Sequence, residues 1–142
     1  AAMNQAQRMI FDALLEQVLA SLPPRLHELL EEAPLVVEDR PSRQLLHEFG
    51  LDHDDRSLCG LYTGVPLTER SVTEGVEPPE SIQIFREGVV MQAGGWERSE
   101  DEDGRPQGGA DAVAGEIRIT LLHEMGHHFG LEEDELAELG YE

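Results

Sequence analysis

Apolar residues recur every three or four positions in the first part of the chain. Seven of them share this spacing: Met9, Ile10, Leu14, Leu15, Val18, Leu19 and Leu22. The spacing predicts an amphipathic helix from Asn4 to about Leu22, because one face of a helix collects residues three and four positions apart. The proline pair at 23–24 ends this helix, and a shorter helix is expected over residues 25–32.

The middle of the chain alternates short apolar runs with turn residues. Residues 35–39 (LVVED) predict a short strand, and Ser42 is placed to cap one or two helical turns that Gly50 ends. Residues 81–85 (SIQIF) alternate polar and apolar side chains, which predicts a half-buried strand. We expect residues 89–91 (VVM) to form its hairpin partner.

The last third of the chain begins with a polar stretch and then turns helical. Residues 96–109 (WERSEDEDGRPQGG) are the least hydrophobic stretch, and we expect them to form a mobile surface loop. Helical spacing returns at Asp111, whose side chain suits an N-cap. Five apolar residues fall on one face of this helix: Ile117, Leu121, Leu122, Met125 and Phe129. Gly130 is placed to end the helix, and one more short helix is expected over residues 132–139.

Length and composition fit one folded domain. The chain has 142 residues, of which 39% are hydrophobic and 28% charged. We expect the domain to span residues 3–142, because Ala1 and Ala2 resemble residues left by an expression vector ahead of Met3.

The charge balance narrows the range of partners. Thirty acidic residues face ten arginines and no lysine, so the net charge is −20. Repulsion by phosphates excludes nucleic acid and anionic membrane surfaces as partners. No apolar run reaches the length of about 18 residues that spans a membrane, and no secretory signal is visible. The single cysteine, Cys59, excludes an internal disulfide and is typical of the cytoplasm, where we expect the protein.

One motif in the chain indicates a catalytic metal site. It is the H-E-x-x-H motif His123-Glu124-Met125-Gly126-His127 on the expected C-terminal helix. Residues i and i+4 lie about 40° apart around a helix axis, so the two imidazoles project from one side and can share a metal ion. Glu124 lies on the flank of that stripe, where it can accept a proton from a water bound to zinc. The motif therefore predicts one zinc ion on His123 and His127, with Glu124 as catalytic general base.

A tetrahedral zinc site needs a third protein ligand, and the residues after the motif supply carboxylates. With Gly130 reversing the chain, the spacing His-x-x-x-His-x-x-Gly-x-x places Glu133 at the ligand position. Asp134 is the alternative third ligand, followed by Glu132.

Other polar residues near the motif have plainer explanations. His128 points towards the apolar face, which predicts a hydrogen-bonded core histidine rather than a ligand. Glu116 either orients a ligand or faces solvent. Cys59 is expected to be a small buried residue and not a nucleophile.

Residues 123–136 (HEMGHHFGLEEDEL) resemble the motif of the small bacterial minimal zincin proteins, which are related to the Asp-zincin metallopeptidases. The similarity extends upstream to residues 58–70 (LCGLYTGVPLTER) and the strand at 82–86, and downstream to residues 139–141, so it covers about residues 11–141. It implies an α+β, zincin-like fold in which a short mixed sheet packs against the motif helix and the N-terminal helices. It also implies a single zinc ion.

Two departures from that family bear on activity. Asp-zincins carry Asp where this chain has Glu133, so either the longer Glu133 reaches the metal or Asp134 replaces it. The chain is also short for a protease, which leaves few residues to build the walls of a substrate cleft. Both departures weigh against efficient proteolysis more than against metal binding.

The sequence thus predicts a zinc-dependent metallopeptidase that hydrolyses peptide bonds by a metal-activated water, with Glu124 as general base. The expected substrate is a peptide or protein, held by strand addition along the edge of the sheet that contains residues 82–86. The alternative is a non-catalytic zincin-like scaffold that acts as a binding or regulatory module. A metal-dependent hydrolase of a non-peptide amide would use the same chemistry. The oligomeric state stays open.

Overall fold

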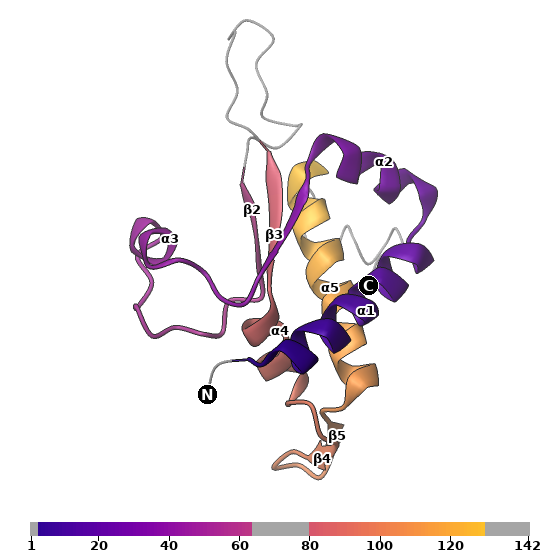
Figure 1. Ribbon diagram of the computed structural model, residues 1–142, viewed down its shortest axis with the longest axis vertical. Coiled ribbons are helices and arrows are strands. Elements are labelled where there is room, and N and C mark those ends of the chain that lie inside the picture. Colours follow the sequence, from indigo (N-terminus) through magenta and orange to yellow (C-terminus); the bar gives the residue numbers. More distant parts are fainter. Residues whose placement is uncertain (1–2, 64–79, 130–142) are drawn as a thin grey trace, which may run out of the picture.

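The computed structural model of the protein describes residues 3–63 and 80–129 (Figure 1). Helices and short strands are both present in these two ranges, and the main sheet mixes parallel and antiparallel pairs, which is consistent with an α+β fold. In chain order they are α1 Gln5–Ser21, α2 Pro24–Glu32, β1 Leu35–Glu38, α3 Arg43–Glu48, β2 Gly60–Thr63, β3 Ser81–Phe85, α4 Arg86–Ala93, β4 Ser99–Glu100, β5 Pro106–Gln107 and α5 Ala110–Phe129.

The two N-terminal helices confirm the predictions from hydrophobic spacing. At the start of α1, the Asn4 side chain accepts the Gln7 N–H at 2.8 Å, and the Gln7 side chain accepts the Asn4 N–H at 3.0 Å. This reciprocal capping box satisfies two of the N–H groups that a helix start leaves without partners. Helix α2 begins at Pro24, one residue earlier than predicted, because proline is well tolerated in the first turn of a helix.

The main sheet has three strands in the order β1-β3-β2, so β3 is the central strand. Strand β1 pairs with β3 in parallel, and β2 pairs with it antiparallel. The register places Leu35, Ile82 and Tyr62 in one row across the sheet, and partners in a row share a face. These three residues belong to or pack against the hydrophobic core, so this face of the sheet is the inner one.

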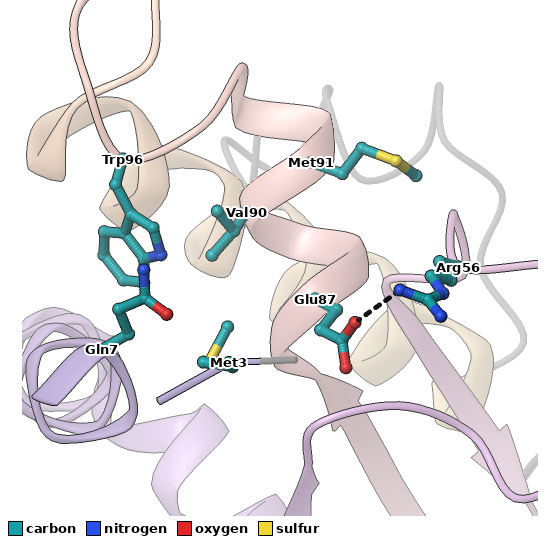
Figure 2. Close-up of a pocket in the computed structure, with 7 residues that line it drawn as sticks. All are labelled: Met3, Gln7, Arg56, Glu87, Val90, Met91 and Trp96. Atoms are coloured by element: carbon teal, nitrogen blue, oxygen red, sulfur yellow. Dashed lines mark ion pairs between the residues drawn. The ribbon is translucent and has the colours of Figure 1, made fainter. Parts of the chain in front are cut away.

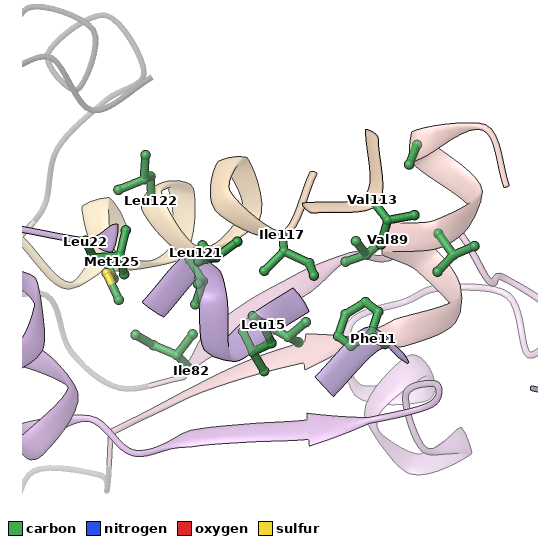
Figure 3. Close-up of a cluster of buried hydrophobic side chains, with 14 of the residues drawn as sticks. Phe11, Leu15, Leu22, Ile82, Val89, Val113, Ile117, Leu121, Leu122 and Met125 are labelled. Atoms are coloured by element: carbon green, nitrogen blue, oxygen red, sulfur yellow. The ribbon is translucent and has the colours of Figure 1, made fainter. Parts of the chain in front are cut away.

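The core lies between the inner face of the sheet and helices α1 and α5 (Figure 3). Helix α5 contributes a stripe of fully buried side chains at i, i+4 spacing: Val113, Ile117, Leu121 and Met125. Phe11 and Leu15 of α1 face this stripe, while Met9 and Ile10 are exposed despite their helical spacing. Burial of the α5 stripe fixes the rotation of the helix and hence the direction in which its polar residues point.

Residues 89–91 do not form the predicted hairpin strand; they lie in α4, which begins directly after β3. Both edges of β3 are already occupied by β1 and β2, so no edge is left for a hairpin partner. The chain instead turns into a helix that buries Val89, Val90 and Ala93 against the core. Gly88 permits this turn, because a Cβ there would overlap the carbonyl group of Leu58. Tertiary packing thus overrides the strand propensity of valine.

Residues 96–109, predicted as a mobile loop, contain the small antiparallel pair β4–β5. The Asp101 side chain fixes the turn between them by accepting the N–H groups of Asp103 and Arg105, each at 2.9 Å. Helix α5 then begins at Ala110, so Asp111 lies inside the first turn and is not the N-cap. Its negative charge still suits the positive end of the helix dipole.

Four charged residues join α1 to the ends of β1 and β3, and we call Arg8, Asp12, Asp39 and Arg86 the arginine–aspartate cluster. Arg86, whose side chain is 14% exposed, donates to Asp12 at 3.0 and 3.1 Å and to Asp39 at 3.0 Å. Arg8 donates to both oxygens of Asp39, at 3.1 and 2.9 Å. The hydrogen bond from Arg8, reinforced by Arg86, lowers the pKa of Asp39.

Some predictions fall on residues 1–2, 64–79 and 130–142, which lie outside the described residues. They include Gly130 as a helix end and the short helix at 132–139. In the described ranges, no helix combines the length and the apolar character needed to cross a lipid bilayer.

Candidate metal centre

The H-E-x-x-H motif lies on the last turns of α5, as the sequence predicted. His123 is half-buried, Glu124 is 4% exposed and His127 is exposed. The two imidazole rings meet edge to face, with their centroids 4.6 Å apart. Because Met125 and the rest of the apolar stripe of α5 point into the core, the two histidines and Glu124 project from the remaining side of the helix, towards β2 and solvent.

The motif residues bring together a donor set that fits a divalent metal ion. One ligand atom from each of His123, Glu124 and His127 lies within 4.8 Å of the others. His127 Nδ1 and Glu124 Oε1 are 3.3 Å apart. Two imidazoles and a carboxylate are a set that zinc accepts, and nitrogens sharing one zinc at about 2.0–2.1 Å must themselves lie within a few ångströms of each other. The described residues bring no other group of this kind together.

Glu124 occupies an unusual environment for a carboxylate. Burial raises the pKa of the Glu124 carboxyl to about 7, although the backbone N–H of Tyr62 hydrogen-bonds to it and acts in the opposite direction. Among the described residues, no arginine lowers the pKa of Glu124 as Arg8 and Arg86 lower that of Asp39. A carboxyl group with a pKa near neutrality can both accept and return a proton at physiological pH.

A polar strip continues from Glu124 towards the start of α5. Thr120, one turn earlier, is 6% exposed, and its hydroxyl hydrogen-bonds to Cys59. Burial raises the pKa of Glu116, so this residue is not simply solvent-facing. Burial, and then the Glu116 carboxylate, raise the pKa of the Cys59 thiol. A thiol held in its protonated form is a poor nucleophile, as predicted for Cys59, although this residue is half-buried and not fully buried.

The hydrophobic pattern did not reveal the part that β2 takes in this site. Gly60 and Tyr62 contact the motif helix or its carboxylate, although they lie some sixty residues before it in the chain. One signal was present: a glycine within a strand often marks a close approach of another element. The predicted third ligand, Glu133, and its alternatives Asp134 and Glu132 lie outside the described residues, as does the side chain of His128.

A cavity of about 260 Å³ lies away from the motif, along α4 (Figure 2). Its lining residues are Met3, Gln7, Arg56, Glu87, Val90, Met91 and Trp96. The two charged side chains in it form an ion pair of 3.8 Å, and Glu87 also binds Arg40 at 2.8 Å. No motif residue lines this cavity, so it is separate from the candidate metal centre.

Comparison with known proteins supports the interpretation of the motif. No curated protein matches this chain. A family model described as zincin-like metallopeptidase matches residues 30–141, which are 112 of the 142 residues and include the whole motif and β2. The match does not reach the finer Asp-zincin subtype, which stays a prediction. With its α+β architecture and a His/Glu cluster on α5, the chain belongs to the zincin-like metallopeptidase family.

Proposed function

We propose that this protein is a zinc-dependent peptidase that uses Glu124 as its general base. The observation that carries the proposal is the convergence of His123, His127 and a buried Glu124 at the edge of a short sheet. A buried carboxylate that no arginine in ranges 3–63 and 80–129 compensates is costly for the fold, and a bound cation would offset that cost. Active sites are where such perturbed groups concentrate.

The metal is proposed to bind to His123 and His127, with Glu133 or Asp134 as the third protein ligand. Bound zinc would act as a Lewis acid that lowers the pKa of water and polarises a carbonyl oxygen. The imidazoles come from one rigid helix whose opposite face is fixed in the core, so their spacing is set before the metal arrives.

Glu124 is proposed to move the proton. Its carboxylate accepts a proton from the attacking water and returns it to the leaving nitrogen of the cleaved peptide bond. In the metal-free chain, burial raises the pKa of Glu124 to about 7, so this carboxylate accepts a proton more readily than an exposed one, which supports the role. The Tyr62 N–H holds the carboxylate in place without removing its capacity to accept a proton.

The peptide is proposed to add to the sheet as an extra strand. Residues 81–85 themselves cannot receive it, because β3 is the central strand; β2 is the edge beside Glu124. The Phe85 N–H donates to the Cys59 carbonyl at 2.8 Å, so alternation along the ladder turns the backbone groups of Gly60 and Tyr62 outwards from β3. An extended chain can pair with such an edge through the backbone groups of Gly60 and the carbonyl of Tyr62, while the Tyr62 N–H stays on Glu124.

Metal analysis and a cleavage screen test the proposal. The purified protein, stripped of metal and given zinc, is expected to retain about one zinc per chain, and His123→Ala to lose it. A peptide library incubated with the zinc form should show cleavage that Glu124→Gln abolishes. Zinc binding without any cleavage would favour the non-catalytic scaffold, and cleavage that survives Glu124→Gln would refute the proposed role of Glu124.

A further inference from the structure

At Gly60, strand β2 lies closer to α5 than a residue with a side chain would allow. A Cβ built on Gly60 would lie 2.7 Å from Thr120 Cγ2, 3.0 Å from the Gln83 carbonyl oxygen and 3.2 Å from Glu124 Cγ. Carbon atoms in contact normally stay about 3.5–4.0 Å apart. The absence of a side chain at position 60 is therefore what permits this close contact.

The close approach has a consequence two residues further along β2. Gly60 and Tyr62 lie on the same side of the ladder, and their backbone groups point outwards from β3. The outward N–H of Tyr62 hydrogen-bonds to the Glu124 carboxylate. If β2 moved away from α5 to accommodate a side chain at position 60, this N–H would move away from the carboxylate with it.

Thr120 forms the other half of the contact. It lies one turn before Glu124 on α5, it is 6% exposed, and its γ-methyl group is the atom nearest to the Cβ position of Gly60. The hydroxyl group on the same side chain hydrogen-bonds to Cys59, the residue that precedes β2. Thr120 thus fixes β2 against α5 and at the same time limits how close the strand can come.

We propose that Gly60 and Thr120 are positioning residues for Glu124: together they set the distance between β2 and α5 at which the Tyr62 N–H holds the carboxylate beside the two histidines. The use of this held carboxylate in catalysis rests on the function proposed above, whereas the contact itself does not. This positioning role needs no contact between the Thr120 side chain, or a side chain at position 60, and the substrate or the metal; it acts through the position of the β2 backbone.

Hydrogen exchange at the Tyr62 amide measures the contact directly. In ¹⁵N-labelled, metal-free protein, this edge amide is expected to exchange slowly, because the carboxylate protects it. Glu124→Ala is expected to accelerate its exchange by about tenfold or more, and Gly60→Ala to do the same. The double variant Gly60→Ala/Thr120→Ser removes the clashing methyl group but keeps the hydroxyl, and should restore protection to within about threefold of the wild type.

Two matched variants control for general effects. Thr120→Ser alone keeps the hydroxyl and should leave Tyr62 protected. Gly115→Ala adds a methyl group to an open position of the same helix, where no atom lies within 4 Å of the new Cβ, and should also leave it protected. If Gly60→Ala unfolds, Glu124→Ala still decides the question, because it removes the acceptor of the Tyr62 N–H without adding a side chain to β2.

The outcomes separate this proposal from the proposed function. Unchanged Tyr62 exchange in Glu124→Ala or in folded Gly60→Ala overturns the positioning role, whether or not the protein cleaves peptides. With a cleaved peptide in hand, Gly60→Ala should lower kcat by about tenfold at unchanged zinc content, and Thr120→Ser in the same chain should restore it. An unchanged kcat despite loss of Tyr62 protection also overturns it. The expected exchange pattern in a protein that cleaves nothing supports the contact and refutes the peptidase function instead.

Discussion

Two groups of side chains in this protein shift the pKa of a carboxyl group in opposite directions. In the arginine–aspartate cluster, Arg8 and Arg86 surround Asp39 and lower its pKa. At the candidate metal centre, burial raises the pKa of Glu124 to about 7, and the hydrogen bond from the Tyr62 backbone N–H offsets that rise only in part. The first arrangement compensates its charges within the chain and serves the fold. The second leaves a charge for a cation to compensate, which is what a metal site requires.

Replacing Glu124 by Gln removes the ionisable carboxylate of the candidate metal centre and has the largest expected effect. Peptide hydrolysis should fall by about 10²–10⁴-fold, the usual contribution of a general base, while zinc stays bound to the histidines. The metal-free fold should not lose stability at pH 8, because an acid whose folded pKa is raised costs stability once it is ionised, and Gln carries no charge. Turnover rates, zinc content and urea unfolding check these points; a Gln variant that unfolds more easily at pH 8 would contradict the account of the buried charge.

Adding zinc should stabilise the protein through the metal centre alone. At a free concentration one hundred times the dissociation constant, a ligand specific for the folded state raises the free energy of unfolding by about 2.7 kcal/mol. Urea unfolding with and without zinc measures this gain, and His123→Ala should abolish it. Arg86→Met is the matched control, because the arginine–aspartate cluster takes no part in metal binding and the zinc gain should persist there. An equal gain in His123→Ala would place the metal elsewhere.

Replacing Arg86 by Met removes one of the two arginines from the arginine–aspartate cluster. The apolar stem is kept, but Asp12 and Asp39 lose hydrogen bonds to a charged partner, so the free energy of unfolding should fall by about 1–3 kcal/mol. Arg98→Met removes an exposed ion pair of 3.5 Å with Asp111 and should change stability by less than about 0.5 kcal/mol. Urea unfolding at pH 7 compares the two; similar losses would mean that the cluster contributes no more than a surface pair.

Acidification tests the charge of Asp39 in the arginine–aspartate cluster, and its expected effect on stability is the smallest of the four. The folded pKa of Asp39 is lowered, so its contribution to stability is present at neutral pH and is lost as the pH falls below about 4, through the folded pKa. Asp39→Asn lacks this contribution throughout. The difference in unfolding free energy between wild type and Asp39→Asn should therefore shrink on acidification. A difference that stays constant from pH 7 to pH 3 would show that Asp39 stabilises the fold by packing and not by charge.

Local pattern was enough to predict much of this molecule. The spacing of apolar residues predicted α1 and most of the buried stripe of α5, prolines predicted the place of α2, and alternation predicted β3 with its observed bounds. The i, i+4 spacing of His123 and His127 predicted that the imidazoles meet, because helix geometry alone brings them together. Each of these features depends on residues close to one another in the chain.

The sequence by itself therefore determined that a rigid helix would present two histidines and a glutamate to one side. It could not determine that residues 89–91 form a helix, because that depends on β1 and β2 occupying both edges of β3. Nor could it determine the burial of Glu124 or its bond to Tyr62, which require β2, some sixty residues away, to approach α5 at Gly60. The order of the strands and the contact between β2 and α5 both depend on residues far apart in the chain. The burial of the Glu124 carboxylate and its hydrogen bond therefore follow from tertiary packing and not from local pattern.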